Sequence, residues 1–197
     1  MDRAGLRRKL LTAQAAAGDI VLLFADESEA LTHPYLAHVW AKKGADLRLP
    51  APGQSAKGAM LGVLDWGRRK LIVRTSRTKR GSAFIARLEE VDRRYGPKLG
   101  VAITPIVLVL DNGPIHTSKM SRAALAQRAH WLTVEWLPKY APELNDIEGL
   151  WRDLKRHHLA HQTFAGPDDL DQAIHDAVRK LNTERSRHPL ANHPTAA

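Results

Sequence analysis

The stretch DIVLLFADE, from Asp19 to Glu27, is a short run of apolar residues that ends in two acids. A second run of this kind, TPIVLVLDN from Thr104 to Asn112, also leads into an aspartate. Continuous apolar runs of this length are typical of strands that are covered on both faces, as in the parallel sheets of α/β proteins. The two runs therefore predict central, parallel strands of an α/β fold that end at Asp26 and Asp111.

The segments around these runs alternate between strand and helix patterns. Residues 57–76 predict a hairpin that turns at Gly67 to Lys70, and residues 82–96 predict an amphipathic helix. The remaining elements are a helix near Ser118 to His130, a strand from Leu132 to Leu137, a helix that begins at Asn145 and a helix from Pro167 to Asn182. This order predicts a mixed sheet in which three antiparallel strands are followed by two strands parallel to the first.

The composition limits the class of protein. The 197 residues suit one domain with a sizeable core, and 44% hydrophobic residues exclude a disordered chain. Thirty Lys and Arg against 21 Asp and Glu give a net charge of +9, which favours nucleic acid or an anionic membrane surface as partner. No apolar run reaches the roughly 20 residues that span a bilayer. No secretory signal is present, and the lack of cysteine excludes disulfides and thiolate metal sites, so we expect a soluble, cytoplasmic protein.

The segment LPKYAPELNDIEGLW, from Leu137 to Trp151, places several acids at the start of a helix in a basic chain. One interpretation is purely local. Asn145 and Glu148 have the spacing of a capping box, in which both side chains bind free backbone N–H groups, and the acids then only suit the helix dipole. In the other interpretation, Glu148 belongs to a reactive site that it shares with Asp26 and Asp111.

Asp26, Asp111 and Glu148 are expected to meet at one edge of the sheet. The carboxyl ends of neighbouring parallel strands lie side by side, and the loop from Leu137 to Glu143 can bring Glu148 to them. Like charges this close cannot all stay ionised in a dry site unless a cation offsets them. The acids therefore predict two Mg²⁺ or Mn²⁺ ions, which prefer oxygen ligands, with phosphates of DNA or RNA completing the coordination.

Three segments surround these acids: FADESEALTHPYLAHVWAKKG, LVLDNGPIHTSK and LPKYAPELNDIEGLWRDLK. Together they resemble the three catalytic motifs of DDE transposases from bacterial insertion sequences allied to the Tc/mariner superfamily. The motifs occur in the family's order, and the 36 residues between Asp111 and Glu148 (positions 112 to 147) are close to its usual spacing. The resemblance extends from about Ile20 to Lys155, which is most of the chain.

The resemblance implies a ribonuclease H-like fold in which Asp26, Asp111 and Glu148 are the catalytic metal ligands. It also implies that Asn112 shapes the turn after the second aspartate. One departure is Asp146, where relatives generally have proline. The acid suits the helix dipole, so we expect this substitution to have little effect on the helix that carries Glu148. The chain would then consist of an N-terminal helical extension (residues 1–18), the catalytic domain (residues 19–184) and a frayed tail (residues 185–197).

The implied reaction is hydrolysis of a DNA phosphodiester at an element end, followed by attack of the freed 3′-OH on target DNA. The implied partners are double-stranded DNA and a second copy of the chain. Only about 18 residues precede the first strand, so we expect the helix-turn-helix part that reads element ends to be encoded separately, or to be missing from a remnant. Two alternatives remain open: a degenerate or non-catalytic basic DNA-binding domain, and a ribonuclease H-type nuclease.

The segment GRRKLIVRTSRTKRG, from Gly67 to Gly81, is rich in basic residues. Charged hairpin edges discourage aggregation, and the same side chains can contact phosphates, so both interpretations stay open. The residues that we expect to contact nucleic acid are Arg68, Arg69, Lys70, Arg77, Lys79, Arg80 and Lys155.

Several other features favour structural roles. The histidines of HHLAH, from His157 to His161, have a spacing that could present two imidazoles to a metal but lack a third ligand motif. Glu27 should point to the opposite strand face from Asp26, and Asp65 should belong to the hairpin. The tryptophans are expected to pack in the core or a cleft. His116 is placed beside the active site by the motif resemblance, and its role is left open.

Overall fold

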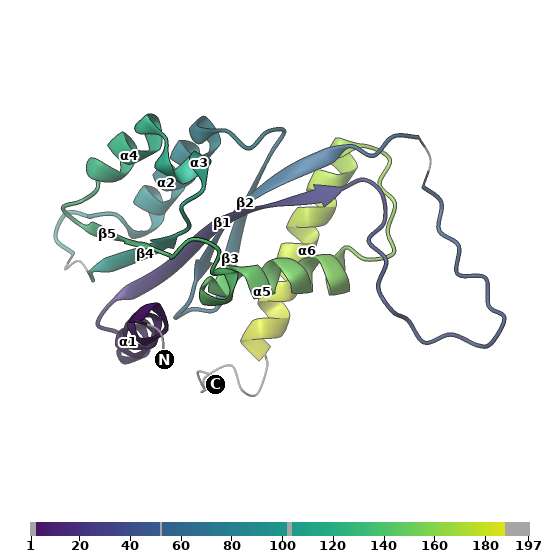
Figure 1. The fold of residues 1–197 in the computed structure, drawn as a ribbon, viewed down its shortest axis with the longest axis horizontal. Helices are drawn as coiled ribbons and strands as arrows, with labels where there is room; N and C mark the ends of the chain where they lie inside the picture. The colour runs from purple at the N-terminus through teal and green to yellow at the C-terminus, as the bar shows by residue number, and fades with distance from the viewer. Residues whose placement is uncertain (1–2, 52, 102–103, 188–197) are drawn as a thin grey trace.

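The computed structural model describes residues 3–51, 53–101 and 104–187, which contain a five-stranded mixed sheet (Figure 1). The strands are β1 (Val21–Leu31), β2 (Lys57–Asp65), β3 (Lys70–Ser76), β4 (Ile106–Leu110) and β5 (Leu132–Trp136). They are arranged in the order β3-β2-β1-β4-β5. The β1–β2 and β2–β3 pairs are antiparallel, whereas β4 and β5 run parallel to β1. The predicted mixed α/β sheet is confirmed.

The first strand is longer than the sequence predicts. It pairs with β4 only from Val21 to Phe24, whereas its pairing with β2 runs from Leu23 to Leu31. Because β2 continues to satisfy the backbone of β1, the strand does not end at Asp26, as predicted, but passes through it. Asp26 lies two positions beyond the last parallel pair, where β1 separates from β4.

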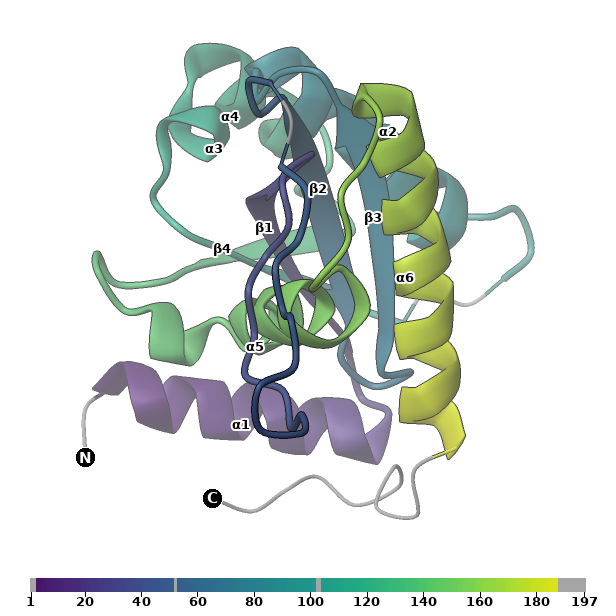
Figure 2. The ribbon, with the colours of Figure 1, turned by 90° about the vertical axis from the view of Figure 1, so that its right-hand side faces the viewer.

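Helices cover both faces of the sheet (Figure 2). One face carries α2 (Gly81–Tyr95), α3 (Pro114–Thr117) and α4 (Lys119–Ala126), and the other carries α1 (Arg3–Ala17), α5 (Asp146–Asp153) and α6 (Pro167–Arg187). Successive residues of β1 alternate between the two cores. Leu22 and Phe24 pack with α1, α5 and α6, whereas Leu23 and Ala25 pack with α2 and α4. This explains why the first apolar run is continuous.

The helix α5 is the element that carries Glu148. A short 3-10 helix, η1 (Pro142–Leu144), precedes α5, and a π-helical turn, η2 (Leu154–His158), follows it. Apolar residues at helical spacing, Ile147, Leu150, Trp151 and Leu154, form a buried stripe. This stripe holds α5 against the sheet.

Gly62 allows α5 to approach β2 closely. A Cβ atom at this position would lie 2.4 Å from Cζ2 of Trp151 and 2.9 Å from Cδ1 of Ile147. No side chain fits at such distances, so the packing requires glycine. Gly62 therefore determines how deep Trp151 lies over the sheet.

Some predicted boundaries differ from the structure. The helix expected from Ser118 to His130 is the shorter α4, which ends at Ala126. A separate helix, α3, precedes it, because Ser118 caps α4 by accepting a hydrogen bond from the backbone N of Ser121. Helix α6 continues to Arg187, beyond the predicted start of the tail, and residues 188–197 lie outside the described residues.

Trp40 is fully exposed in the long connection between β1 and β2 (Figure 1), so its predicted packing role is wrong. Within the described ranges, every helix is too short or too polar to cross a membrane.

We expect Gly62→Ala to lower the free energy of unfolding by about 1–3 kcal/mol, because the added methyl group overpacks the contact with Trp151. Urea unfolding measures the loss. Gly58→Ala in the same strand is the control, since its Cβ would mainly meet the end of the Leu170 side chain, at 3.3 Å. Equal losses in the two variants would contradict the proposed importance of the Trp151 contact.

Candidate active site

Asp26 is buried on the face of the sheet that α5 covers. It is 8% exposed, and its Oδ2 accepts a 3.1 Å hydrogen bond from Nε1 of Trp151. Trp151 reaches this carboxylate because α5 lies close to the sheet at Gly62. The sequence marks Trp151 only as a packing residue, since no local pattern shows that its indole N–H meets a carboxylate 125 positions away.

The charges of the other two predicted acids act on Asp26. Burial, together with the negative charges of Glu148, Glu27 and Asp111, raises the pKa of Asp26 to about 7. The fold therefore brings Asp26, Asp111 and Glu148 into one electrostatic environment. A carboxyl group in this state is only partly ionised at neutral pH, and a nearby cation would favour its ionised form.

Asp111 directly follows β4 and is held by its own loop. Its Oδ1 accepts a 2.9 Å hydrogen bond from the backbone N of Gly113 and lies 2.6 Å from Nδ1 of His116. A Cβ atom at position 113 would lie 2.9 Å from the same oxygen, so the turn needs glycine. The hydrogen bond from His116 lowers the pKa of Asp111. Asp111 is thus kept ionised, in contrast to Asp26.

His116 links Asp111 to the opposite face of β1. It is fully buried, its Nε2 lies 2.8 Å from Oε1 of Glu27, and its ring packs edge-on against Phe84. Burial alone would lower the pKa of His116, but its hydrogen bond with Asp111 and its close contact with the carboxylate of Glu27 raise it to about 9. His116 is therefore an imidazolium between two carboxylates. The sequence did not reveal this role, because both partners are known only once β1 and β4 are paired.

Asn112 joins the loop after β4 to the end of β5. Its Nδ2 donates a hydrogen bond to the backbone O of Leu137. This contact fixes the start of the segment that leads to Glu148, in keeping with the turn-shaping role that the sequence predicts for Asn112.

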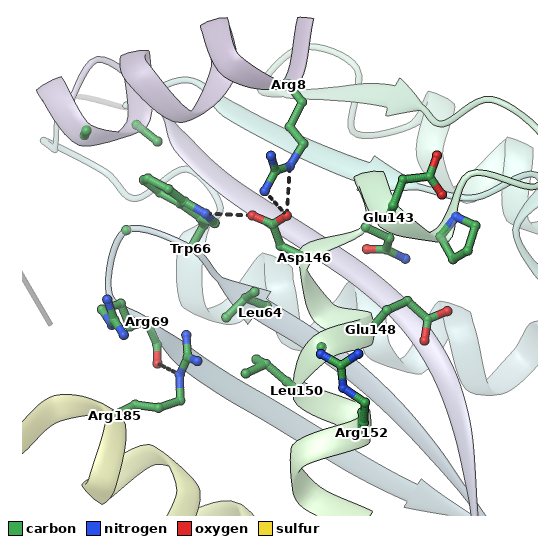
Figure 3. Close-up of a pocket in the computed structure, with 16 residues that line it drawn as sticks. Arg8, Leu64, Trp66, Arg69, Glu143, Asp146, Glu148, Leu150, Arg152 and Arg185 are labelled. Atoms are coloured by element: carbon green, nitrogen blue, oxygen red, sulfur yellow. Dashed lines mark hydrogen bonds and ion pairs between the residues drawn. The ribbon is translucent and has the colours of Figure 1, made fainter. Parts of the chain in front are cut away.

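Glu148 lies in the first turn of α5, between two cavities. A cavity of about 460 Å³ is lined by Asp111, Tyr140, Asn145 and Glu148, among others. A larger cleft of about 990 Å³ lies on the other side of the helix start (Figure 3). Asn145 and Glu148 line both. Glu148 is thus accessible from two sides, whereas Asp26 is buried.

The capping-box interpretation is wrong, because the capping hydrogen bond that it expects from the Asn145 side chain is not formed. Asn145 is the N-cap residue of α5, but its side chain makes no capping hydrogen bond. Its Oδ1 is buried and has no hydrogen-bond partner among the described residues. Asp146 has a different role, since it accepts hydrogen bonds from Nε of Arg8 at 2.8 Å and Nε1 of Trp66 at 2.9 Å (Figure 3). Capping therefore does not account for Glu148.

The donor set of Asp26, Asp111 and Glu148 suits divalent metal ions. All three supply carboxylate oxygens, the ligand type that Mg²⁺ and Mn²⁺ prefer, and the raised pKa of Asp26 reflects like charges that a cation would offset. In the part of the chain that the structure describes, no three His, Asp or Glu side chains are grouped closely enough to hold an ion as they lie. Metal binding would therefore require these side chains to converge further.

The predicted basic residues do not form one patch. Two groups lie at opposite ends of β3: Arg68, Arg69 and Lys70 at one end, and Arg77, Lys79 and Arg80 at the other. Some of these charges are already paired. Arg68 binds Asp65 through its backbone N and its side chain, and Arg77 lies 2.7 Å from Asp168.

The charges of two of the predicted acids reach Lys155, and Lys79 lies near Lys155. Burial lowers the pKa of Lys155, and so does the charge of Lys79, while Glu148 and Asp26 act in the opposite direction. Lys79 also lies 3.6 Å from a carboxylate oxygen of Glu29. Lys155 is thus in the electrostatic environment of the acids, and Lys79 is next to it.

The remaining candidates lie away from the acids. Asp65 belongs to the hairpin, as predicted, and also accepts a hydrogen bond from the hydroxyl of Tyr95. In the HHLAH segment, Nε2 of His158 lies 3.3 Å from Glu184 of α6, and His157 is exposed.

A family model described as "DDE superfamily endonuclease" matches residues 21–171 of the chain. Among curated proteins, the "Insertion element IS630 uncharacterized 39 kDa protein" of Shigella sonnei is 26% identical over 133 residues. The aligned region makes up 68% of this chain and 37% of that protein. The chain therefore spans well under two thirds of this relative.

Solved structures of Mos1 transposase share the fold. The Mos1 paired-end complex with the left transposon end matches with a TM-score of 0.59 at 16% identity, over 92% of this chain and 59% of that chain. The Mos1 strand transfer complex matches with a TM-score of 0.59 at 15% identity, over 99% of this chain and 62% of that chain. The sheet and its helices thus form a ribonuclease H-like fold.

In metal-free buffer above pH 7, we expect Asp26→Asn to be more stable than the wild type. The pKa of Asp26 is raised from 3.8 to about 7 on folding, so its contribution to stability is greatest below 3.8 and is lost as the pH rises through 7. The gain should be on the order of 4 kcal/mol or less, measured by urea unfolding in EDTA. Asp19→Asn, at an exposed acid, is the control. A less stable Asp26→Asn would show that the neighbouring acids do not strain Asp26.

The stability advantage of the wild type over His116→Asn should shrink as the pH rises. The pKa of His116 is raised from 6.5 to about 9, so its stabilising charge is fully present below 6.5 and is lost as the pH rises through 9. The expected change across this window is about 3 kcal/mol, followed by urea unfolding in EDTA. His130→Asn, on the surface, should show no such trend. A difference that is constant with pH would mean that His116 is neutral.

Proposed function

We infer the function from one premise: the chain belongs to the DDE superfamily endonucleases. We propose that it is the catalytic domain of a DNA transposase of the IS630 and Tc/mariner type. It would cleave phosphodiesters at element ends and join the freed 3′-OH to target DNA. The observation that carries the proposal is that Asp111 and Glu148 line one cavity, and that the charges of both raise the pKa of the buried Asp26.

Asp26, Asp111 and Glu148 are the residues that would hold divalent ions, which we propose to be two Mg²⁺ or Mn²⁺ ions. Bound ions would act as Lewis acids on the attacking and leaving oxygens of the phosphodiester. The oxygen donors and the raised pKa of Asp26 support this assignment. A further Mos1 complex is described as containing Mn, which agrees with a divalent metal in a protein of this fold.

The chain's own side chains orient the acids. Trp151 directs Oδ2 of Asp26, and the imidazolium of His116 keeps Asp111 ionised and in place. Their common task is to hold the carboxylate oxygens in a fixed geometry. The protein then positions the reacting groups and does not attack them itself. No nucleophilic side chain is needed.

Both proposed steps are substitutions at phosphorus. In the first, a water oxygen bonds to phosphorus while the bond to the 3′ oxygen breaks, which leaves a 3′-OH and a 5′-phosphate. In the second, this 3′-OH bonds to a target phosphorus while the target's bond to its own 3′ oxygen breaks. Each step forms one P–O bond and breaks one. The proton of the attacking group passes to solvent, and the leaving 3′ oxygen takes up a proton from solvent.

Double-stranded DNA is the proposed substrate. The net charge of +9 supports a polyanion, and the Mos1 relative is described in complex with a transposon end. Lys79 and Lys155 are proposed to contact phosphates near the reacting bond, because Lys155 is in the electrostatic environment of the acids and Lys79 is next to it. We further propose a homodimer that pairs two DNA ends, a separately encoded helix-turn-helix part and a cytoplasmic location.

With Mg²⁺ or Mn²⁺, the protein should nick supercoiled plasmid DNA and join a 3′-OH oligonucleotide to it. Asp26→Asn, Asp111→Asn and Glu148→Gln should each reduce both activities at least a hundredfold, because each removes a charged ligand from the metal site. Gel assays of nicking and joining measure this. DNA binding in EDTA should remain within about twofold of the wild type, since these acids do not bind phosphate themselves.

Glu143→Gln is the matched control for Glu148→Gln, because Glu143 lies just before the same helix and lines the same cleft. It should retain activity. Full activity of Glu148→Gln would exclude Glu148 as a ligand. Cleavage of RNA–DNA hybrids without nicking of double-stranded DNA would indicate a ribonuclease H-type nuclease instead.

A further inference from the structure

The larger cleft beside Glu148 is formed by segments that are far apart in the sequence. Helix α1, the turn between β2 and β3, the start of α5 and the end of α6 line a volume of about 990 Å³ (Figure 3). Asn145 and Glu148 line this cleft and also the smaller cavity beside Asp111. The two cavities therefore adjoin at the start of α5.

Four arginines line the cleft. Arg8 binds Asp146, and the other three come from three further segments: Arg69 from the hairpin turn, Arg152 from α5 and Arg185 from α6 (Figure 3). Nε of Arg185 donates a 3.2 Å hydrogen bond to the backbone O of Arg69, which holds the two residues side by side. Burial lowers the pKa of Arg185, and so does the charge of Arg69, while Asp153 acts in the opposite direction. Like charges held together in a partly buried place favour an anion between them.

The acids of the cleft are distributed unevenly around these arginines. Asp146 is engaged by its two hydrogen bonds to α1 and the hairpin turn. Glu143 and Glu148 lie on the side of the cleft away from Arg69 and Arg185 (Figure 3). Arg69 and Arg185 thus lie together on one side of the cleft, whereas Arg152 lies beside Glu148 on α5, the helix whose start adjoins the active site (Figure 3).

A glycine within a helix forms part of the wall. Gly149 lies in α5 and lines the cleft, and a Cβ atom there would meet no atom of the described chain within 4 Å. Glycine destabilises a helix interior relative to alanine, and packing within the chain does not require it here. Close approach of a ligand to the helix backbone is a physical reason for glycine at such a position.

We propose that this cleft binds successive backbone phosphates of the DNA strand whose reacting phosphodiester lies at the three acids. The strand runs from Glu148 past Gly149 to the guanidinium groups of Arg69, Arg152 and Arg185. Guanidinium groups suit this task because they donate paired hydrogen bonds to phosphate oxygens. The proposal rests on the proposed function, since it takes DNA as the substrate of the same site.

A free phosphate ion offers the same chemistry to the arginines. The volume of the cleft, about 990 Å³, is that of a pocket for a large ligand rather than for a single ion. The cleft is also continuous with the acids through Glu148. These two properties favour a DNA strand.

The test is DNA binding in EDTA, so that no chemistry takes place. A variant with Arg69→Asn, Arg152→Gln and Arg185→Gln is compared with the wild type on a fluorescent DNA duplex over a series of KCl concentrations. Asparagine at position 69 tolerates the left-handed backbone of this residue, whose φ is 55°. The slope of log K against log salt should become shallower by about 2 to 3, because each lost phosphate contact contributes about 0.9.

The matched control removes three arginines from the opposite side of the sheet: Arg93→Gln, Arg94→Gln and Arg122→Gln. These exposed residues lie on α2 and α4, and the change in net charge is the same. The control should keep most of the wild-type slope. Equal slopes for the cleft variant and the wild type would overturn the proposal, as would equal losses in the two triple variants.

Gly149→Ala tests the path of the strand without changing any charge. We expect a higher melting temperature, because alanine favours the helix, together with DNA binding that is weakened several-fold. A stabilised variant that binds DNA as tightly as the wild type would contradict the passage of the strand along Gly149.

The absence of cysteine from the chain allows a direct probe of position. Arg152→Cys, carrying an iron–EDTA group, should cut the backbone of bound DNA at least tenfold more than Arg122→Cys carrying the same group. Equal cutting would overturn the proposal. Binding of inorganic phosphate, detected by a thermal shift, without a change of DNA slope in the triple variant would assign the cleft to a free ion. These readouts need no cleavage activity, so they can fail while the proposed function stands, and the reverse also holds.

Discussion

The contact between Trp151 and Gly62 determines the geometry of the site. It lets α5 lie close over β2, which brings the indole N–H of Trp151 to Asp26 and Glu148 to the edge of the sheet. Two distant motifs are thereby joined through one aromatic ring. The same ring belongs to the core under α1, α5 and α6, so the arrangement of the acids depends directly on the packing of that core.

The two aspartates are held in opposite electrostatic states. Asp26 is buried near other carboxylates and resists ionisation, whereas Asp111 is paired with an imidazolium and stays charged. His116 also ties Asp111 to Glu27, on the other face of β1. The strand thus carries adjacent acids with different tasks, one directed to the proposed metal site and one that fixes the residue supporting it. A bound cation would therefore change the ionisation of Asp26, which is protonated in part, more than that of Asp111, which is already ionised.

Much of the fold was predictable, because it depends on local patterns. The continuous apolar runs identified β1 and β4, and the chain order of strands and helices predicted the mixed sheet. The end of β1 could not be predicted, because the antiparallel partner that prolongs it to Leu31 begins far along the chain. Trp40 shows a second limit of prediction from sequence. Its large apolar side chain suggests burial, but the connection between β1 and β2 leaves it exposed.

The three acids were predictable from their motifs and order, but their supporting contacts were not. The indole of Trp151, the two partners of His116 and the hydrogen bonds from Arg8 and Trp66 to Asp146 all join positions that are distant in sequence or are set by strand pairing. Arg69 was predicted to contact nucleic acid, but its neighbour Arg185 was missed for the same reason, since the two residues are 116 positions apart. The capping box failed because a matching spacing does not ensure that the Asn145 side chain turns toward the helix.

The central claim is that Asp26, Asp111 and Glu148 jointly bind divalent metal when DNA is present. The most direct measurement is anomalous X-ray diffraction from crystals of the protein with DNA and Mn²⁺. The account predicts anomalous peaks bounded by carboxylate oxygens of all three residues, with a DNA phosphate beside them. Mn²⁺ peaks elsewhere, or peaks that one of the three residues does not reach, would contradict it.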